Sequence, residues 1–377
     1  TESGKITDEA LLELAAGCEK TIPLAISVPE QGKCALKVTW YQKQATEVLP
    51  EQFELGFEEV LVKTKDNQNQ KAKEMMKRPE GTASFGWKED DHYLTVSTEQ
   101  FSYTYNKFTG LFEGMCYANQ NLLDRPMELN IWRAPTDNDF GAGLQKKYAA
   151  WKNPEMKLTS LNGRMENKQV IVEAAYDMPT VSAKLDLTYV INNKGAIKIT
   201  QKMTADKSAK VSPMFRFGMQ MPMPRSFENI EYYGRGPVEN YIDRKGNADL
   251  AIYRQTVDEQ FYSYIRPQEN GTKSDIRWWK MLNEAGNGIE VVASAPFSAS
   301  ALHYTIESLD DGARKDQRHS PEVEEADLTN LCLDKVQMGL GCVNSWGTIA
   351  LPEYQIPYGD YEFTFILTPV KHSIEIE

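Results

Sequence analysis

Residues 169–203 read QVIVEAAYDMPTVSAKLDLTYVINNKGAIKITQKM, and their pattern of side chains decides the fold class. Residues 169–175, 183–191 and 196–203 are short runs in which apolar and polar side chains largely alternate. A period of two is typical of β-strands that bury one face. No amphipathic stretch of helical length separates the runs, which argues against βαβ units and therefore against a TIM barrel or a doubly wound sheet.

Strand-like runs of the same kind recur over most of the chain, at His92–Val96, Phe101–Tyr105, Ile289–Ala293 and Tyr361–Thr368. Helical patterns are few, and we expect helices only near Phe140–Lys152 and around Glu307–Asp316. So many strands in one long segment predict an all-β fold for residues 82–377, with two large antiparallel sheets packed face to face.

The first 65 residues predict a separate, small β-sandwich. Short alternating runs at Thr21–Val28, Ala35–Gln42 and Phe57–Lys63 are separated by polar turns. Asp8–Ala16 contains helix-forming residues, but it spans only about two turns before Gly17, so a helix is not favoured there. Residues 66–81 are almost devoid of aliphatic side chains, and we predict a linker between two domains.

Composition limits the partners. With 54 acidic and 42 basic residues the net charge is −12, which disfavours nucleic acid and anionic membrane surfaces, whereas neutral sugars suit this charge. No run approaches the ~20 apolar residues of a membrane helix.

The five cysteines lack a CxxC pair and the four histidines lack HxH or HExxH spacing, so we expect buried thiols and no metal site. The chain begins without methionine and without a leader pattern, so we expect that a native N-terminus has been removed.

Residues 232–244, YYGRGPVENYIDR, gather polar side chains around a Gly-Arg-Gly-Pro turn. Arg235, Glu239 and Asn240 could bond sugar hydroxyls while a tyrosine face stacks on the ring. The alternative, slightly favoured by the residues alone, is an internal network in which arginines pair with carboxylates and stiffen the loop.

Residues 264–279, YIRPQENGTKSDIRWW, form a second polar cluster containing Glu269 and Asn270. Neighbouring strand residues point to opposite faces, so one of the two adjacent tryptophans should lie in the core. Glycoside hydrolysis needs two carboxyl groups about 5 to 10 Å apart, and Glu239 with Glu269 is a pair to test, although nothing in the sequence fixes their separation. His303 lies in a strand-like run, where an inward-facing, hydrogen-bonded histidine is the common case.

Two further motifs have both a structural and a functional interpretation. In residues 130–141, NIWRAPTDNDFG, the run Asp137, Asn138, Asp139 could bind a cation, but it lacks the closing Glu of a calcium loop, and capping of the following helix is the favoured reading. Residues 338–347, MGLGCVNSWG, are a glycine-rich turn whose tryptophan, Trp346, is either a sugar platform or a lid over the end of the sandwich.

Taken in order, these motifs together with residues 297–305, FSASALHYT, closely resemble the C-terminal part of bacterial β-galactosidases of glycoside hydrolase family 2. The resemblance covers Trp87 to the end of the chain, and residues 1–65 look like the immunoglobulin-like domain that precedes this part. It implies a galactose-mutarotase-like supersandwich over residues 82–377. It also implies that the tryptophan of the Ser-Trp pair, here Trp346, stacks on the aglycone sugar.

In that family the catalytic glutamates lie in a preceding TIM barrel, for which this chain has no counterpart. The resemblance therefore implies a fragment of a retaining β-galactosidase, with no catalytic residue here and with Mg²⁺ and Na⁺ bound in the absent barrel. The implied partners are β-galactosides, the remainder of the enzyme and further copies in a homo-oligomer. The compartment, bacterial cytoplasm or periplasm, stays open. The alternatives are a stand-alone carbohydrate-binding module and an aldose 1-epimerase that uses His303 with Glu239 or Glu269.

Overall fold

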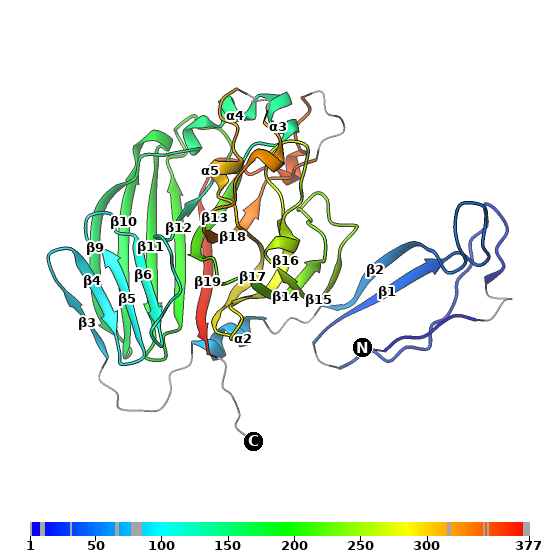
Figure 1. Ribbon diagram of the computed structural model, residues 1–377, viewed down its shortest axis with the longest axis horizontal. Helices are drawn as coiled ribbons and strands as arrows, with labels where there is room; N and C mark the ends of the chain where they lie inside the picture. The colour runs from blue at the N-terminus through cyan, green and yellow to red at the C-terminus, as the bar shows by residue number, and fades with distance from the viewer. Residues whose placement is uncertain are drawn as a thin grey trace, which may run out of the picture. The chain divides into compact units, whose positions relative to one another are not determined.

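The structure is a computed structural model that describes residues 2–7, 12–30, 32–64, 68–76, 85–314, 318–341, 344 and 347–371. The chain divides into two compact units, Thr1–Asp66 and Asn67–Glu377. Figure 1 shows both, and each is described by itself below.

In the described part of the smaller unit, β1 (Lys33–Tyr41) and β2 (Glu54–Thr64) form one two-stranded antiparallel sheet. These strands correspond to two of the three runs predicted there. The third prediction is wrong, because Thr21–Val28 is not a strand. Its apolar side chains Leu24, Ile26 and Val28 are 39–48% exposed, so no packed face holds this segment in a sheet. The immunoglobulin-like sandwich stays a prediction.

The larger unit contains a 12-stranded sheet and a 5-stranded sheet, all of whose pairings are antiparallel. The main path of the large sheet runs β15-β14-β16-β17-β19-β12-β11-β10-β9. Its strands are β9 (Lys157–Glu166), β10 (Gln169–Met178), β11 (Ala183–Ile191), β12 (Ile197–Ala205), β14 (Asn229–Gly236), β15 (Asp249–Thr256), β16 (Lys273–Leu282), β17 (Gly288–Leu302) and β19 (Tyr361–Val370).

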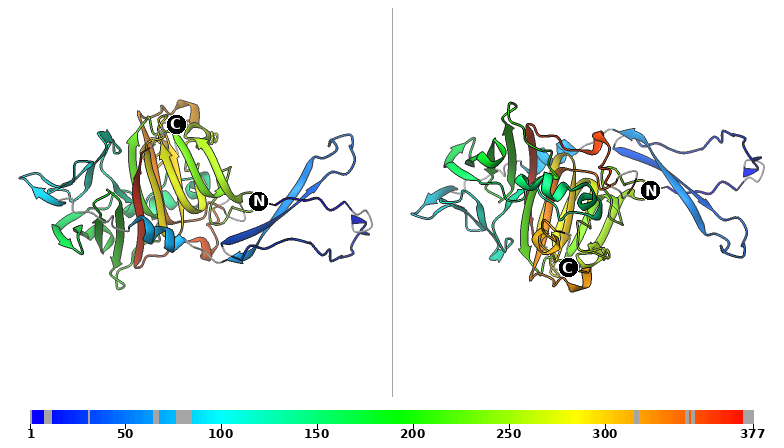
Figure 2. Two further views of the ribbon diagram at one scale, coloured as in Figure 1. Left: turned by 90° about the horizontal axis from the view of Figure 1, so that it is seen from below. Right: turned by 90° about the horizontal axis from the view of Figure 1, so that it is seen from above.

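Strand β17 changes partner along its length, which splits the large sheet. Its first half pairs with β19 and its last residues pair with β18 (Leu328–Gln337). Strand β18 in turn pairs with β13 (Arg216–Pro224), which also pairs with β8 (Glu128–Asn130). Figure 2 shows the resulting bend between the β14–β17 strands and the β9–β12 strands.

The 5-stranded sheet covers one face of the β9–β12 strands, and the two sheets share a buried aromatic core. The sheet consists of β3 (Gly86–Glu89), β4 (Tyr93–Ser97), β5 (Phe101–Asn106), β6 (Phe112–Tyr117) and β7 (Gln120–Asn121). Across the interface the rings of Tyr105 and Tyr189 lie 4.9 Å apart, and the Tyr103 hydroxyl donates to the Gly195 carbonyl at 2.7 Å. The predicted all-β fold of two antiparallel sheets packed face to face is confirmed.

Short helices lie at the two ends of the larger unit (Figure 1). Helices α3 (Asp137–Ala142), α4 (Leu144–Lys147) and α5 (Ile306–Leu309) lie at one end, and α2 (Gln68–Met75) lies at the other. The described part of the larger unit also contains short 3-10 helices, at Ala149–Trp151, Pro179–Val181, Asp258–Gln260, Ser320–Glu322 and Pro352–Tyr354.

The helix predictions need correction. The segment Phe140–Lys152 is not one helix, because Gly143 takes φ = 71° between α3 and α4 and a left-handed residue ends an α-helix. Of the predicted helix around Glu307–Asp316 the structure describes residues up to Arg314, and within these only the single turn of α5 forms. Of the predicted linker 66–81 the structure describes residues 68–76, and these contain α2, in which Lys71 bonds to Glu290 and lies 5.2 Å from the centre of the Trp278 ring. The low aliphatic content did not reveal this helix, because these contacts are made by a charged side chain.

The expectation of buried thiols is right for Cys332 and wrong for Cys18, which is exposed; Cys34 and Cys116 are half-buried. Cys18 lies outside β1 and β2, and none of the described side chains of the smaller unit is buried, so no core is available to cover its thiol. Cys342 lies outside the described residues.

Candidate functional site

The end of the larger unit that carries α3 is built on a buried ion pair. Thr136 caps α3 in a capping box with Asp139: the Asp139 N–H donates to the Thr136 hydroxyl and the Thr136 N–H donates to the Asp139 carboxylate. The fully buried Arg133 donates to both oxygens of the same carboxylate, at 3.0 and 2.8 Å. The favoured structural reading of Asp139 as a capping residue therefore agrees with its contacts.

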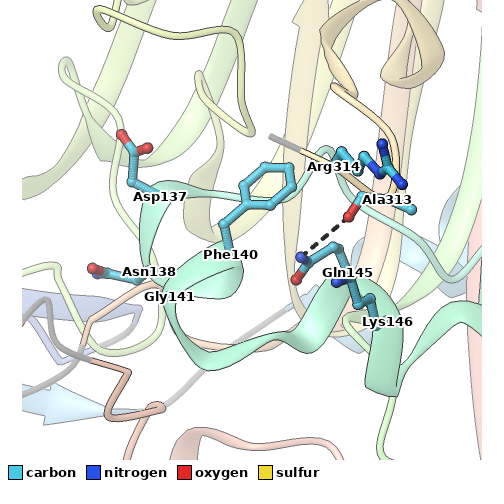
Figure 3. Close-up of a pocket in the computed structure, with 8 residues that line it drawn as sticks. All are labelled: Asp137, Asn138, Phe140, Gly141, Gln145, Lys146, Ala313 and Arg314. Carbon is cyan, nitrogen blue, oxygen red and sulfur yellow. Dashed lines mark hydrogen bonds between the residues drawn. The ribbon is translucent and has the colours of Figure 1, made fainter. Parts of the chain in front are cut away.

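A pocket of about 490 Å³ opens beside α3 and α4 (Figure 3). This volume lies within the ~300–1,000 Å³ typical of small-ligand sites. Figure 3 shows the Phe140 ring between Asp137 and Arg314, and the Gln145 amide donates to the Ala313 carbonyl at 3.5 Å. An aromatic ring, amides and a carboxylate are the side chains that bind sugars through stacking and hydroxyl hydrogen bonds. The lining residues are Asp137, Asn138, Phe140, Gly141, Gln145, Lys146, Ala313 and Arg314.

Glu239 is held by three hydrogen bonds from within the chain. One carboxylate oxygen accepts from the Arg244 guanidinium and the Tyr264 hydroxyl, and the other accepts from the Gly271 N–H at 2.8 Å. Burial and the bond to Glu239 raise the pKa of Tyr264 to about 12, so the hydroxyl stays protonated as a donor. The carboxylate of Glu239 thus joins its own loop, through Arg244, to the loop of Tyr264 and Gly271.

Glu269 belongs to a second, deeper ionic cluster. Its carboxylate accepts from the Thr272 hydroxyl at 3.0 Å and from the Arg216 guanidinium at 3.2 Å. Arg216 also pairs with Asp334, and all three charged side chains are at most 6% exposed. The adjoining cavity measures about 20 Å³, room for only one or two water molecules, so a sugar ring cannot enter it.

Arg235 and Asn240 also bond to groups of the chain itself. Arg235 donates to the Asp275 carboxylate and to the Ala248 carbonyl, both at 2.8 Å. The Asn240 amide group donates to the carbonyls of Arg235 and Val238, and its oxygen accepts from the Ser274 N–H. These contacts match the internal network that the sequence offered as the alternative to sugar binding.

Asn270 and His303 complete the set of predicted site residues. The Asn270 amide oxygen accepts from the Tyr262 N–H at 3.2 Å, and its amide nitrogen donates to the Gln268 carbonyl at 3.0 Å. His303 is 2% exposed, and its Nδ1 lies 2.9 Å from the Leu328 carbonyl. Its Nε2 lies 3.8 Å from the Asp258 carboxylate and 4.0 Å from the Glu228 carboxylate.

Trp346, the predicted sugar platform, lies outside the described residues, as does Ser345. The next described residue, Gly347, is close to α3: a Cβ added there would lie 3.0 Å from the Gly141 carbonyl oxygen. Gly347 therefore lies next to Gly141, a residue that lines the pocket.

Several residues that shape this region were not found from the sequence. Arg216, Asp334 and Lys273 are charged residues within strands β13, β18 and β16, and all are at most 1% exposed. The available signal was a charged residue at an inward position of an otherwise apolar run, as in residues 214–219, MFRFGM. Among the described residues, no group of three or more His, Cys, Asp or Glu side chains is arranged to hold a metal ion. None of the helices described is long and apolar enough to cross a membrane.

Lys273 gives a first prediction. Burial lowers the pKa of its ammonium group to about 8, against the opposing effect of Glu239, while the unfolded value is near 10.5. Between these values the unfolded chain binds the proton that the folded chain has lost, so stability should rise with pH from 8 to 10.5. Below pH 8 the cost of the buried charge is present in full. We therefore expect Lys273→Met to raise the free energy of unfolding at pH 7 by roughly 1–3 kcal/mol and to flatten that rise.

Urea unfolding at pH 7 and pH 9.5 measures both effects of Lys273→Met. Lys184 on β11 is exposed and serves as the control, because Lys184→Met removes the same charge without a burial cost. Equal pH slopes in the wild-type chain and in Lys273→Met would contradict the prediction.

The fold and the site together define a large antiparallel β-sandwich protein with a polar pocket at one end of its sheets. Residues 97–367 match the family model described as the β-galactosidase small chain, and this chain belongs to that family. The chain is 31% identical over 296 residues to a β-galactosidase of Priestia megaterium, covering 75% of this chain and 27% of that protein. It is 32% identical over 284 residues to a β-galactosidase of Lactobacillus delbrueckii subsp. bulgaricus, covering 74% and 27%.

A β-galactosidase of Actinobacillus pleuropneumoniae is 28% identical over 378 residues, covering 97% of this chain and 35% of that protein. The chain thus spans about a quarter to a third of the length of these relatives. Among solved structures, a galactose mutarotase related enzyme from Lactobacillus acidophilus is similar with a TM-score of 0.41 and 8% identity, covering 76% of this chain and 99% of that chain. Similarity at this level says nothing about the activity of this chain.

Proposed function

We propose that this chain is one part of a β-galactosidase that hydrolyses terminal β-D-galactosides by a retaining mechanism. In this proposal the chain forms the aglycone-side wall of the active site, and the catalytic glutamates belong to a part of the enzyme outside it. Membership of the β-galactosidase small chain family supports the assignment. The share of its relatives that the chain covers supports a role as one part of a larger enzyme.

The main support for placing the catalytic glutamates outside this chain is the hydrogen bonding of Glu239 and Glu269. A retaining glycosidase needs one carboxyl that attacks the sugar and one that donates a proton to the leaving group. Both tasks require a carboxyl that reaches the substrate. Glu239 is engaged by Arg244, Tyr264 and the Gly271 N–H, and Glu269 by Arg216 beside a cavity too small for a sugar.

The pocket beside α3 is the part of the chain that we assign to sugar contact. Phe140 offers a ring face for the C–H side of a pyranose, and the side-chain oxygens of Asp137 and Asn138 offer acceptors for hydroxyls. Trp346 belongs to this proposal through the family resemblance. Arg235, Glu239, Asn240, Glu269, Asn270 and His303, whose described contacts lie within the chain, would act indirectly by holding the loops around it.

The proposed macromolecular partner is the remainder of the β-galactosidase. Apolar side chains are exposed on the loops around Glu239, namely Val238, Ile242, Tyr262 and Ile265, with exposures from 36% to 79%. In this proposal another segment of the enzyme covers these side chains, since a contiguous exposed apolar area is typical of an interaction surface. Mg²⁺ and Na⁺, which the resemblance implies for the enzyme, would bind in that remainder, and a homo-oligomer of the whole enzyme is part of the same proposal.

Turnover of a chromogenic β-galactoside tests the proposal. We expect the isolated chain to give no turnover above buffer and the complete enzyme to hydrolyse the substrate. In the complete enzyme, Glu239→Gln and Glu269→Gln should each retain cleavage within about a hundredfold of wild type, whereas loss of a nucleophile or an acid costs far more. Robust turnover by the isolated chain would contradict the proposal, and so would complete loss of activity in either variant that still folds.

The pocket also supports a second candidate, binding of galactosides by this chain on its own. Its volume and its mixed aromatic and polar lining are the observations that favour it. Calorimetric titration of the chain with lactose distinguishes the two functions. If the chain supplies only one side of the active site, the dissociation constant for lactose should be roughly millimolar or weaker. The aldose 1-epimerase alternative predicts faster equilibration of galactose anomers in polarimetry, and no contact of His303 favours it.

A further inference from the structure

The backbone of Met338–Gly341, which follows β18, is held by side chains from two other motifs. The Arg133 guanidinium donates to the carbonyl oxygens of Met338 at 2.7 Å and Gly339 at 3.3 Å. The Asn138 amide donates to the Leu340 carbonyl at 3.1 Å. Arg133 precedes α3, whereas Asn138 lies in its first turn and also lines the pocket. The carbonyl side of Met338–Gly341 is therefore bonded to the buried Arg133 and to one residue of the pocket lining.

The amide side of the same segment is held by Asp243. One carboxylate oxygen accepts from the Leu340 N–H at 3.2 Å, and the other accepts from the Gly341 N–H at 2.6 Å. A carboxylate that bonds two successive backbone amides makes charge-assisted bonds, which are stronger than those between neutral groups. Met338–Gly341 thus lies between the α3 segment and Asp243.

Asp243 is itself fixed in direction. It lies in a tight turn closed by two backbone bonds, from the Tyr241 N–H to the Arg244 carbonyl and from the Arg244 N–H to the Tyr241 carbonyl, both 3.0 Å. Tyr241 is 1% exposed and anchors the turn in the larger unit. The carboxylate is therefore presented by a short, anchored turn, and it has little freedom to leave the amides.

The two glycines of the segment are required by this contact. A Cβ on Gly339 would lie 2.5 Å from the Asp243 carboxylate, and a Cβ on Gly341 would lie 2.7 Å from its Oδ2. Distances under 3.0 Å are closer than side-chain carbons approach, so only glycine admits the carboxylate at both positions. The glycine-rich motif and the turn of Asp243 are complementary in shape as well as in hydrogen bonding.

We propose that Asp243 is a positioning residue for sugar recognition: it clamps Met338–Gly341 against the buried Arg133 and against Asn138, which lines the pocket. Asp243 itself does not touch the sugar. It sets where Met338–Gly341 lies relative to Asn138 and thus to the pocket. This inference rests on the proposed function, because the sugar in question is the aglycone of a galactoside.

The clamp is tested on the isolated chain by hydrogen exchange of the peptide that contains Leu340 and Gly341. In Asp243→Asn the amide can accept from only one of the two N–H groups, and exchange should become about tenfold faster, the size of one lost charge-assisted bond. Gly341→Ala crowds the intact carboxylate and should give the same direction of change. Asp186→Asn on β11 is the matched control, since Asp186 is exposed and its loss should leave this peptide unchanged.

The positioning role is tested in the complete β-galactosidase with an aryl galactoside and added glucose as the acceptor. In a retaining mechanism water and glucose compete for the same galactosyl-enzyme. The glucose concentration that gives half-maximal transfer therefore measures how well glucose binds on the aglycone side. We expect Asp243→Asn to raise this concentration about tenfold and to change kcat for hydrolysis without acceptor less than about twofold.

The two experiments test the contact between Asp243 and Met338–Gly341 separately from the proposed function. Faster exchange together with a weaker acceptor site supports the inference, whereas unchanged exchange overturns the clamp and faster exchange with an unchanged acceptor site overturns the positioning role. A wild-type complete enzyme without activity on β-galactosides overturns the proposed function and with it the role in sugar recognition. In that case the exchange data still decide whether Asp243 holds the segment.

Discussion

Replacing Arg216 with methionine is expected to lower the free energy of unfolding of the larger unit by about 3–5 kcal/mol at pH 7. Arg216 is 1% exposed, and its guanidinium bonds to both oxygens of Asp334 and to Glu269 at 3.2 Å. Methionine fills most of the volume but leaves two buried carboxylates without their cation. The cost therefore comes from the uncompensated charges and only slightly from packing.

The same variant should have a distinctive pH dependence. In the wild-type chain burial raises the pKa of Asp334 to about 6, and Arg216 opposes this shift. Without Arg216 the folded-state pKa rises further above the unfolded value of 3.8, so the folded chain takes up a proton as the pH falls. The stability deficit of Arg216→Met should thus shrink between pH 7 and pH 5.

Urea unfolding followed by near-ultraviolet circular dichroism at these two pH values measures the deficit. Arg164→Met is the matched control, because Arg164 pairs with Glu166 and Glu173 on the surface at 46% exposure and should cost no more than about 1 kcal/mol. Equal losses for the two arginine variants would show that the buried cluster does not stabilise the fold in this way.

In the complete enzyme, Trp346→Ala is expected to raise the glucose concentration for half-maximal transfer by about 10- to 30-fold. An aromatic platform under a sugar ring contributes roughly 1.5–2 kcal/mol through stacking and burial of apolar surface. Trp346→Phe keeps a smaller ring and should lie between the alanine variant and the wild type. Hydrolysis of an aryl galactoside without glucose reports whether the effect is confined to the aglycone side.

Trp40→Ala is the control for Trp346→Ala, because Trp40 is 52% exposed on β1 of the smaller unit. It should leave the acceptor concentration unchanged. An acceptor response in Trp346→Ala equal to that of the wild-type enzyme would remove Trp346 from the proposed site, while the pocket beside α3 would keep its own assignment.

The predictions that came from periodicity agree closely with the structure. The runs 183–191, 169–175 and 196–203 correspond to β11, β10 and β12, whose burial alternates along much of their length. Of the two adjacent tryptophans, Trp279 is fully buried and Trp278 is not, as the alternation of side chains in a strand requires. Strands β13 and β18 were not predicted, because they are buried on both faces and include charged residues that interrupt the apolar pattern.

The residues of the candidate site were found only in part. Asp137, Asn138 and the loop of Glu239 were identified from polar clusters in the sequence, but the pocket combines α3 and α4 with Ala313 and Arg314, far away in the chain. The helical pattern of Phe140–Lys152 predicted one continuous helix, whereas Gly143 divides it and turns α4 so that Gln145 and Lys146 line the pocket.

The all-β class, the positions of many strands and the family resemblance follow from side-chain alternation and short motifs, which are local along the chain. The pairing of each arginine with its carboxylate depends instead on the folded arrangement: Arg216 and Asp334 are 118 positions apart, and Asp243 reaches Leu340 across 97. Such pairs form because burial makes an unpaired charge costly, and which charges are buried together depends on how distant strands pair.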